Sequence, residues 1–308
     1  MNCRSDRYQI KNIVHIDAGL EQIKQMIPSY DAVVICDVPS SIRNLILKYC
    51  YGKGIRVYMT PKISDILVRS AEDMTLFDTP LIMARNGQIS IEQAFLKRIL
   101  DIIIAGTTVG RVRVMTNDRG KQVKEAAIKL QDGGPVIYRQ RRLTLNGHVF
   151  YVYKFRSMTM DAEKDGIARL ACIDDNRITP IGAIIRKIRF DELPQLFNIL
   201  KGDMSIVGPR PERPEIAEQY EKEMPEFHYR LRVKAGLTGY AQIFGKYNTT
   251  PYDKLKLDLH YIQNYSFMLD IKLIIQTVKI LFMKDSTEGV AQNQTTAARS
   301  NPGVKERE

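Results

Sequence analysis

The sequence predicts two units of different fold class, a partial α/β unit over residues 1–90 and a mainly helical, α+β unit over residues 133–284. Residues 30–61 have the pattern strand, helix, strand. Apolar residues recur at helical spacing at 193–200 and again at 269–282. The length of 308 residues leaves room for two ordinary domains with sizeable cores.

The N-terminal pattern is typical of a βαβ unit with two parallel strands. D-A-V-V-I-C-D-V at 31–38 and G-K-G-I-R-V-Y-M at 52–59 predict the strands, and S-S-I-R-N-L-I-L-K-Y-C-Y at 40–51 predicts the helix between them. Ser40 or Ser41 can cap this helix, and Gly52 with Gly54 can end it. No G-x-G-x-x-G occurs here, so the pattern does not predict a dinucleotide site.

The next segment, residues 91–132, begins as an apolar helix and then changes character. The basic pair Lys97–Arg98 precedes an apolar run that stops at Gly110, and residues 111–129 hold eight charged residues in nineteen. A membrane-spanning helix needs about 20 apolar residues, and each central charge adds roughly 2.5–3.5 kcal/mol to the free energy of insertion. The segment therefore does not predict a spanning helix.

The most informative stretch, at 186–214, reads R-K-I-R-F-D-E-L-P-Q-L-F-N-I-L-K-G-D-M-S-I-V-G-P-R-P-E-R-P. It places the adjacent carboxylates of Asp191 and Glu192 at the expected start of a helix, with Pro194 in the first turn. Arginines stand on both sides, at 186, 189, 210 and 213. Carboxylates among cations suit phosphate chemistry, in which one acts as nucleophile and another holds a metal. The alternative is that Asp191 is only a helix cap and the arginines only a solvated face.

The C-terminal third contains two further patterns. G-L-T-G-Y-A-Q at 236–242 predicts a loop where backbone approaches a ligand closely, or else a plain turn. The helix expected at 269–282 has a broad apolar face that could lie in a membrane interface or pack against the core. The tail at 285–308 is polar and is predicted to be disordered.

Composition limits the choice of partners. The net charge of +11 and the pI near 9.4 suit an anionic membrane surface and anionic substrates. They would suit nucleic acid too, but no helix-turn-helix, zinc or RNA-binding motif is present, and we expect no nucleic-acid partner. Neither the histidines nor the cysteines have metal-ligand spacing, and the cysteines are expected to be reduced thiols.

Seven segments between residues 95 and 284 resemble the bacterial sugar transferases, the monotopic polyprenyl-phosphate glycosyl-1-phosphate transferases. They are G-P-V-I-Y-R-Q at 134–140, Y-K-F-R-S-M at 153–158, D-N-R-I-T-P-I-G at 175–182, F-D-E-L-P-Q-L at 190–196, S-I-V-G-P-R-P at 205–211, K-A-G-L-T-G-Y-A-Q at 234–242 and L-D-L-H-Y-I-Q-N-Y-S at 257–266. One such match would be weak, but seven in the family's order are highly specific.

The resemblance implies a two-step transfer at the cytoplasmic face of the bacterial inner membrane, by a peripheral or monotopic protein. Asp191 would attack the sugar-bearing phosphate of a UDP-sugar, UMP would leave, and undecaprenyl phosphate would then take up the phosphosugar, which initiates exopolysaccharide, capsule or O-antigen synthesis. Glu192 would hold Mg²⁺. The side chains expected to bind phosphate or substrate are Arg210 first, then Arg156, Arg186, Arg189 and Asp258.

Several roles stay open at this point. Asp258 and Asp270 match acidic positions of the family, and each could orient an arginine, lie near the nucleotide, or serve only in pairing or capping. The histidines give no support to a His triad mechanism. The sugar is not indicated, and a homo-oligomer is possible.

Two departures from the family pattern give a second hypothesis. Residues 1–90 resemble the Rossmann-like domain of the longer members, whose transmembrane helices upstream have no counterpart here, so the N-terminus looks truncated. The charged residues 111–129 replace an apolar re-entrant segment, by engineering or by a compensated pair of frameshifts. The alternative function is therefore an inactive remnant or binding module of the same fold with a disrupted membrane segment.

Overall fold

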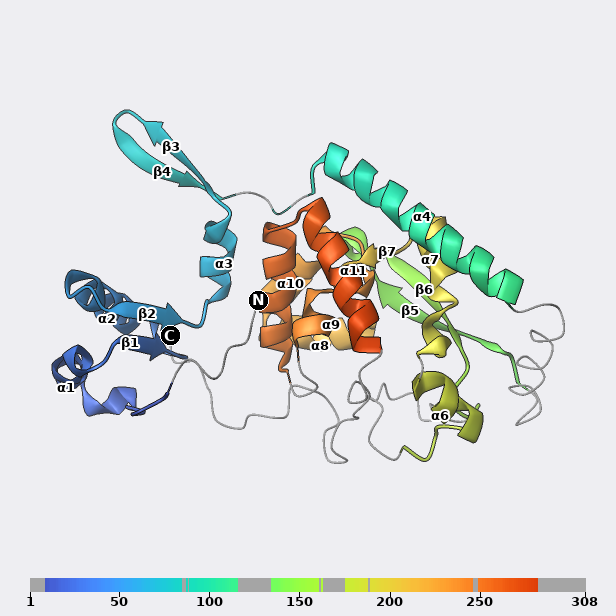
Figure 1. The fold of residues 1–308 in the computed structure, drawn as a ribbon, viewed down its shortest axis with the longest axis horizontal. Helices are drawn as coiled ribbons and strands as arrows, with labels where there is room; N and C mark the ends of the chain where they lie inside the picture. The colour runs from blue at the N-terminus through green and yellow to red at the C-terminus, as the bar shows by residue number, and fades with distance from the viewer. Residues whose placement is uncertain are drawn as a thin grey trace. The chain divides into compact units, whose positions relative to one another are not determined.

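The computed structural model describes residues 9–84, 87, 89–115, 134–160, 162, 175–187, 189–245 and 249–281. The chain divides into two compact units, Met1–Lys62 and Ile63–Glu308, each with its own hydrophobic core (Figure 1). Most of the charged segment at 111–129 and the whole tail at 285–308 lie outside the described residues, so our expectations for them stay predictions.

The smaller unit contains the predicted βαβ unit. Strand β1 (Ala32–Ile35) pairs in parallel with β2 (Arg56–Met59), and helix α2 (Ser40–Gly52) connects them. Helix α1 (Leu20–Met26) precedes them between the short 3-10 turns Ile16–Ala18 and Ile27–Ser29. The predicted serine cap is wrong, because Pro39 occupies the N-cap of α2 and no side chain caps it. With two strands described, the Rossmann-like assignment of residues 1–90 stays an expectation.

The segment after Lys62 packs within the larger unit. Helix α3 (Ile63–Arg69) lies against α10 (Pro251–Gln263), and Ile66 is buried in the larger core. The antiparallel hairpin of β3 (Glu72–Leu76) and β4 (Thr79–Met83) follows. The boundary between the compact units therefore falls earlier than residue 90, since the packing of Ile66 joins positions far apart in the sequence.

The described part of the larger unit is mainly helical, as predicted for residues 133–284, and holds three two-stranded sheets, of which the β3–β4 hairpin is the first (Figure 1). The hairpin of β5 (Ile137–Leu143) and β6 (Val149–Phe155) turns at Asn146 and Gly147, which both have positive φ, with the 3-10 turn Leu145–Gly147 between the strands. Strand β7 (Ser205–Val207) pairs in parallel with β8 (Gly236–Thr238). The other helical segments are α4 (Ile91–Met115), α6 (Pro180–Lys187), η5 (Phe190–Glu192), α7 (Gln195–Lys201), α8 (Pro214–Glu223), η6 (Pro225–Arg232), α9 (Tyr240–Phe244) and α11 (Phe267–Leu281).

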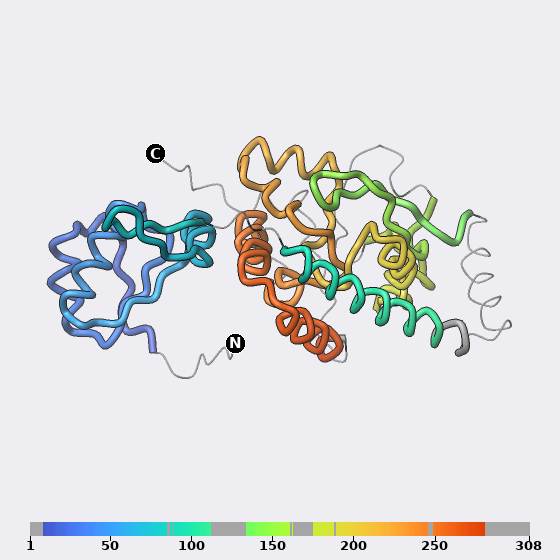
Figure 2. Tube along the Cα trace, turned by 90° about the horizontal axis from the view of Figure 1, so that it is seen from above, coloured from blue at the N-terminus to red at the C-terminus, as the bar shows by residue number. Residues whose placement is uncertain are grey.

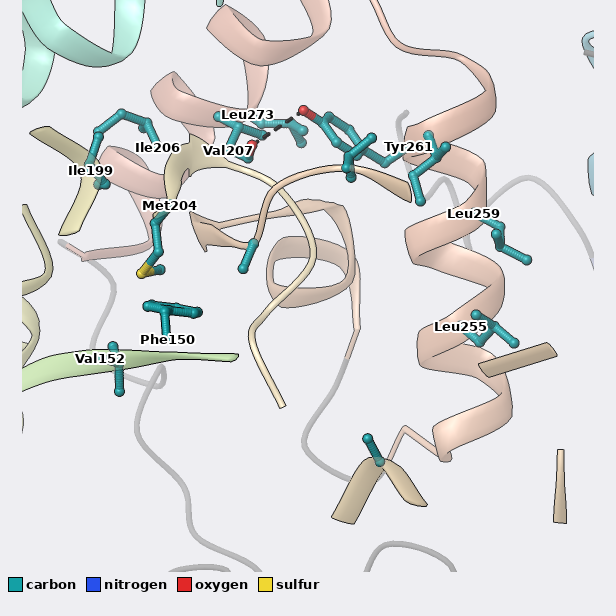
Figure 3. Packing of buried hydrophobic residues seen from close by; sticks show 14 of the residues in the cluster. Phe150, Val152, Ile199, Met204, Ile206, Val207, Leu255, Leu259, Tyr261 and Leu273 are labelled. Carbon is teal, nitrogen blue, oxygen red and sulfur yellow. Dashed lines mark hydrogen bonds between the residues drawn. The ribbon is translucent and has the colours of Figure 1, made fainter. Parts of the chain in front are cut away.

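The core of the larger unit joins the β5–β6 hairpin and the parallel strands β7 and β8 with helices α3, α4, α7, α8, α10 and α11. Figure 3 shows Phe150 and Val152 of β6 facing Met204, with the buried residues of β7 beyond them. Helix α4 packs on α7, β7 and α11 (Figure 2). Helix α11 buries Leu273 in this core, as the core-packing alternative for residues 269–282 expects, while its other face is exposed at Met268, Ile275 and Val278.

Within the part of the chain that the structure describes, no helix is both long enough and apolar enough to cross a membrane.

Candidate functional site

The two adjacent carboxylates lie in a tight turn between α6 and α7. Asp191 and Glu192 belong to the 3-10 turn η5, and Arg189 enters this turn with a left-handed backbone (φ 53°, ψ 26°). Helix α7 begins at Gln195 with Pro194 as its N-cap, so Asp191 lies one turn before the helix rather than at its cap. The ring of Phe190 stacks on Phe155 of β6, with 5.6 Å between the ring centroids, and this contact fixes the turn to the sheet.

Glu192 is held by two cations. Its Oε1 accepts a hydrogen bond from Arg210 Nη2 at 3.3 Å and lies 3.9 Å from Lys154 Nζ. Burial acts to raise the pKa of Glu192, but the charges of Arg210, Lys154 and Arg189 outweigh it, so the pKa is lower than usual. Glu192 is therefore ionised at neutral pH and can act as a ligand or an electrostatic partner.

Asp191 has the opposite electrostatic balance. Burial and the neighbouring charge of Glu192 raise its pKa, while Lys154 and Arg186 oppose the shift. The two adjacent acids thus differ in environment, since one is firmly paired and the other is less stabilised as an anion. A less stabilised carboxylate is the better nucleophile of the two.

Lys154 is a site residue that the sequence-based prediction missed. It comes from the Y-K-F-R-S-M segment, in which only Arg156 was selected. Burial lowers the pKa of Lys154 to about 8, with Glu192 raising it and Arg210 lowering it further. No local pattern identifies Lys154, because its place beside Glu192 depends on the packing of β6 against the η5 turn, where Phe155 stacks on Phe190.

Arg156 is placed differently from Lys154. It is 7% exposed and packs beside Gly134, where an added Cβ would overlap the guanidinium. The absence of a side chain at Gly134 therefore leaves the space that the Arg156 guanidinium fills. A contact between Arg156 and phosphate stays a prediction.

Arg210 is presented by a loop that two backbone contacts fasten. Gly208 N–H donates to Thr238 O at 2.8 Å, and Gly236 N–H donates to Pro209 O at 2.9 Å. A Cβ at Gly236 would overlap the Gly208 amide nitrogen, and one at Gly239 would overlap the Gly208 carbonyl oxygen. The glycines at 236 and 239 thus allow close approach of backbone to backbone. The Arg210 side chain also donates from Nη1 to Gln242 Oε1 at 3.3 Å.

Asp258 supports this loop from inside the protein. It is 1% exposed and accepts from Arg230 through Nε at 2.9 Å and Nη2 at 2.7 Å. Arg230 Nη2 also donates to the carbonyl oxygen of Arg210 at 2.9 Å. Of the roles left open for Asp258, the structure shows one: Asp258 orients the side chain of Arg230. Contact with the nucleotide stays a prediction.

Asp270 is also a pairing residue in this structure. It is 1% exposed, and its Oδ2 lies 2.6 Å from Lys97 Nζ, while Tyr261 donates its hydroxyl to Oδ1 at 2.8 Å. Burial raises the pKa of Asp270, with the positive charge of Lys97 opposing it.

The side chains at this site could supply only part of the oxygen ligands that Mg²⁺ needs. Among the described residues, no group of three or more histidine, cysteine or acidic side chains could hold a metal ion. Magnesium is commonly bound by one or two carboxylates together with water and substrate phosphate. Glu192, with Asp191 beside it, supplies such a pair, and the fit therefore depends on phosphate oxygens of a ligand.

The carboxylates of Asp191 and Glu192 have Lys154, Arg186, Arg189 and Arg210 as electrostatic neighbours, a charge pattern that suits phosphorylated ligands. The chain belongs to the bacterial sugar transferase family, whose model matches residues 92–284.

Three relatives illustrate the similarity. A UDP-N-acetylgalactosamine-undecaprenyl-phosphate N-acetylgalactosaminephosphotransferase of Aeromonas hydrophila is 38% identical over 238 residues, 76% of this chain and 54% of the relative. A UDP-glucose:undecaprenyl-phosphate glucose-1-phosphate transferase of Xanthomonas campestris pv. campestris is 36% identical over 241 residues, 75% of this chain and 48% of the relative. A protein of the same name from Caulobacter vibrioides (strain ATCC 19089 / CIP 103742 / CB 15) is 35% identical over 195 residues, 62% of this chain and 71% of the relative. The chain spans about half the length of the first two.

Proposed function

We propose that this chain is a phosphoglycosyl transferase that moves a sugar-1-phosphate from a UDP-sugar to undecaprenyl phosphate through a covalent intermediate on Asp191. The observation that carries the proposal is the different environment of two adjacent acids, with Glu192 paired to Arg210 and Asp191 less stabilised as an anion. The acceptor follows from the names of the relatives, which specify undecaprenyl phosphate.

The first step forms one bond and breaks one. A carboxylate oxygen of Asp191 attacks the phosphorus that bears the sugar and forms an acyl phosphate. The bond between this phosphorus and the oxygen that bridges it to the other phosphorus breaks, and UMP leaves with the bonding electron pair. In the second step a phosphate oxygen of undecaprenyl phosphate attacks the same phosphorus and releases the Asp191 carboxylate.

The surrounding cations bind and orient the anionic groups. Arg210 presents a planar guanidinium whose geometry suits phosphate, and Lys154 adds a second positive charge near the same oxygen of Glu192. Arg186 and Arg189 add positive potential at Asp191 and Glu192. Glu192 would hold Mg²⁺, which neutralises phosphate oxygens when bound. Fixed charges of this kind stabilise charge that develops during phosphoryl transfer.

A lipid acceptor requires access to a membrane surface. Helix α4 exposes Phe95, Leu96, Ile99, Ile102 and Ile103. We propose that the protein works at the cytoplasmic face of the inner membrane and initiates polysaccharide synthesis, with this apolar face toward the lipid.

The test is an assay of UMP release with the full chain, Mg²⁺, undecaprenyl phosphate and a panel of UDP-sugars. We expect release from wild type, loss in Asp191→Asn, and an adduct of hexose phosphate at residue 191 detected by mass spectrometry. The charged segment at 111–129 favours the alternative, an inactive remnant or binding module. Absence of release with every sugar from a folded wild-type chain would establish that alternative.

A further inference from the structure

Strand β7, which leads into the Arg210 loop, has an open edge. Among the described strands its one neighbour is β8, toward which Ser205 N–H donates to Ala235 O at 2.9 Å. Alternate amides of a strand point to opposite sides, so Ile206 N–H points away from β8. A buried amide needs an acceptor, and here that acceptor is Oδ1 of Asp101, 2.8 Å away on helix α4.

The Asp101 carboxylate accepts the backbone hydrogen bond that a third strand of the sheet would accept. It is 3% exposed, and the same Oδ1 also accepts from Ser205 Oγ at 3.0 Å. An apolar side chain at this position would leave the buried amide of Ile206 without its acceptor. The carboxylate is therefore explained by the two hydrogen bonds it accepts from β7.

A second group on the same face of α4 reaches the next residue of the strand. Lys97 lies one helical turn before Asp101 and pairs with Asp270, which accepts the hydroxyl proton of Tyr261. The Tyr261 hydroxyl lies 3.4 Å from the carbonyl oxygen of Val207 (Figure 3). Helix α4 thus binds residues 205 and 206 directly through Asp101, and Lys97 with Asp270 fixes the Tyr261 hydroxyl beside residue 207.

The held strand is directly connected to the site. Gly208 and Pro209 follow Val207, Pro209 has a fixed φ, and Gly208 is bonded to Thr238. A displacement of β7 therefore carries the Arg210 guanidinium with it. Such a displacement would change the distance of 3.3 Å between Arg210 Nη2 and Glu192 Oε1.

We propose that Asp101 is a positioning residue: through Ser205 and Ile206, helix α4 sets the place of Arg210 in the site. This deepens the proposed function and rests on it for its kinetic consequence. The link means that the helix with the exposed apolar face and the residue that binds phosphate are part of one connected unit.

Amide hydrogen exchange tests the link without requiring activity. In the full-length Asp101→Ala chain, we expect the amides of Gly208 and Gly236, which Asp101 does not touch, to exchange at least tenfold faster, while those of α8 keep their wild-type rates. Asp101→Asn retains an oxygen acceptor and should restore much of the protection. Faster exchange at Ile206 alone, or equally across α8, would overturn the proposal.

A control and a kinetic cycle complete the test. Arg98→Gln also removes α4 hydrogen bonds, but those go to α7, so Gly208 should stay protected. In UMP release, Asp101→Ala should lower kcat at least tenfold in wild type and less than twofold in an Arg210→Ala chain. Equal effects in both backgrounds would overturn the inference. A wild type without activity would instead overturn the proposed function, and exchange would still decide the link.

Discussion

Lys154 is a site residue whose charge state changes with pH just above the physiological range. It lies 3.9 Å from Glu192, too far for a direct hydrogen bond, and burial lowers its pKa to about 8. The ammonium is charged below that pH and neutral above it. Because the proposed substrates are anionic, loss of this charge weakens binding and transition-state stabilisation together.

We therefore expect kcat/KM for UMP release to fall as pH rises through about 8, the pKa of Lys154 in the free protein. Lys154→Arg should move this fall to higher pH, since a guanidinium stays charged. Stability should change in the opposite direction. The folded pKa lies below the ordinary 10.5, so the unfolded chain binds the extra proton between pH 8 and 10.5, and this group raises stability by on the order of 3 kcal/mol over that window. A pH profile of activity unchanged in Lys154→Arg would contradict the assignment.

Gly236 gives a second prediction at the residue scale. A Cβ there would overlap the backbone of Gly208 and Thr238, neither of which can turn aside as a flexible side chain could. Gly236→Ala should lower the free energy of unfolding by about 1–3 kcal/mol or more. The matched control is Gly106→Ala in α4, where nothing lies within 4 Å, and a gain of about 0.5–1 kcal/mol is expected from helix propensity. Denaturant unfolding measures both.

The site residues that could be predicted from sequence were those close together in the chain. Asp191, Glu192 and Arg210 fall within one 29-residue stretch, and the structure brings Glu192 and Arg210 into contact. Lys154 and Arg230 reach the same place from distant segments, and their pairing with acids depends on tertiary packing. The glycines at 236 and 239 were expected to let backbone approach a ligand, which stays a prediction. In the structure they let it approach the Gly208 backbone, which no local pattern specifies.

At the scale of elements, the basic pair of α4 has an internal role. Lys97 pairs with Asp270, and Arg98 donates to the carbonyl oxygens of Ile199 and Leu200, the latter at 2.7 Å. Both carbonyls belong to the last turn of α7, where intrahelical donors run out, and the Ile199 carbonyl accepts from the backbone N–H of Gly202 at 3.0 Å as well as from Arg98. The pair therefore fastens α4 to the rest of the larger unit, on the side away from its exposed apolar residues.

We expect Arg98→Ala to lower the free energy of unfolding by about 2–4 kcal/mol, because two charge-assisted hydrogen bonds to buried carbonyls are lost. Lys272→Ala removes an exposed charge from α11 and should stay within about 0.5 kcal/mol of wild type. Thermal or denaturant unfolding of the two variants is the measurement. Similar small effects in both would mean that the Arg98 bonds contribute nothing to stability.

Helices and strands could be predicted where the sequence signals that define them lie close together in the chain. The βαβ unit was predicted because its strands, helix and turns follow one another within 32 residues, 30–61. The β5–β6 hairpin was not, although Asn146-Gly147 is a strong hairpin turn, because its strands are rich in arginine and aromatic residues rather than cleanly alternating. The start of α7 was misplaced by one turn because Pro194 is compatible with both an N-cap and a first-turn position.

The whole molecule consists of two units whose cores share no residue. Ile27, Ile35, Ile46 and Cys50 form the smaller core, and the larger core is built from residues after Lys62. The sequence predicted two units, but not the boundary, since the burial of Ile66 among residues far along the chain cannot be read from its own segment.

Separate cores predict separate unfolding, and Cys50 can report it. Its side chain is fully buried, and Cys3→Ser, Cys36→Ser and Cys172→Ser together leave it as the only thiol of the four. Ile46→Ala should destabilise the smaller unit by about 2–4 kcal/mol and speed maleimide labelling of Cys50 roughly 30- to 700-fold. Leu273→Ala should destabilise the larger unit by a similar amount and leave labelling of Cys50 unchanged. Acceleration by both variants would mean that the two cores unfold as one cooperative system.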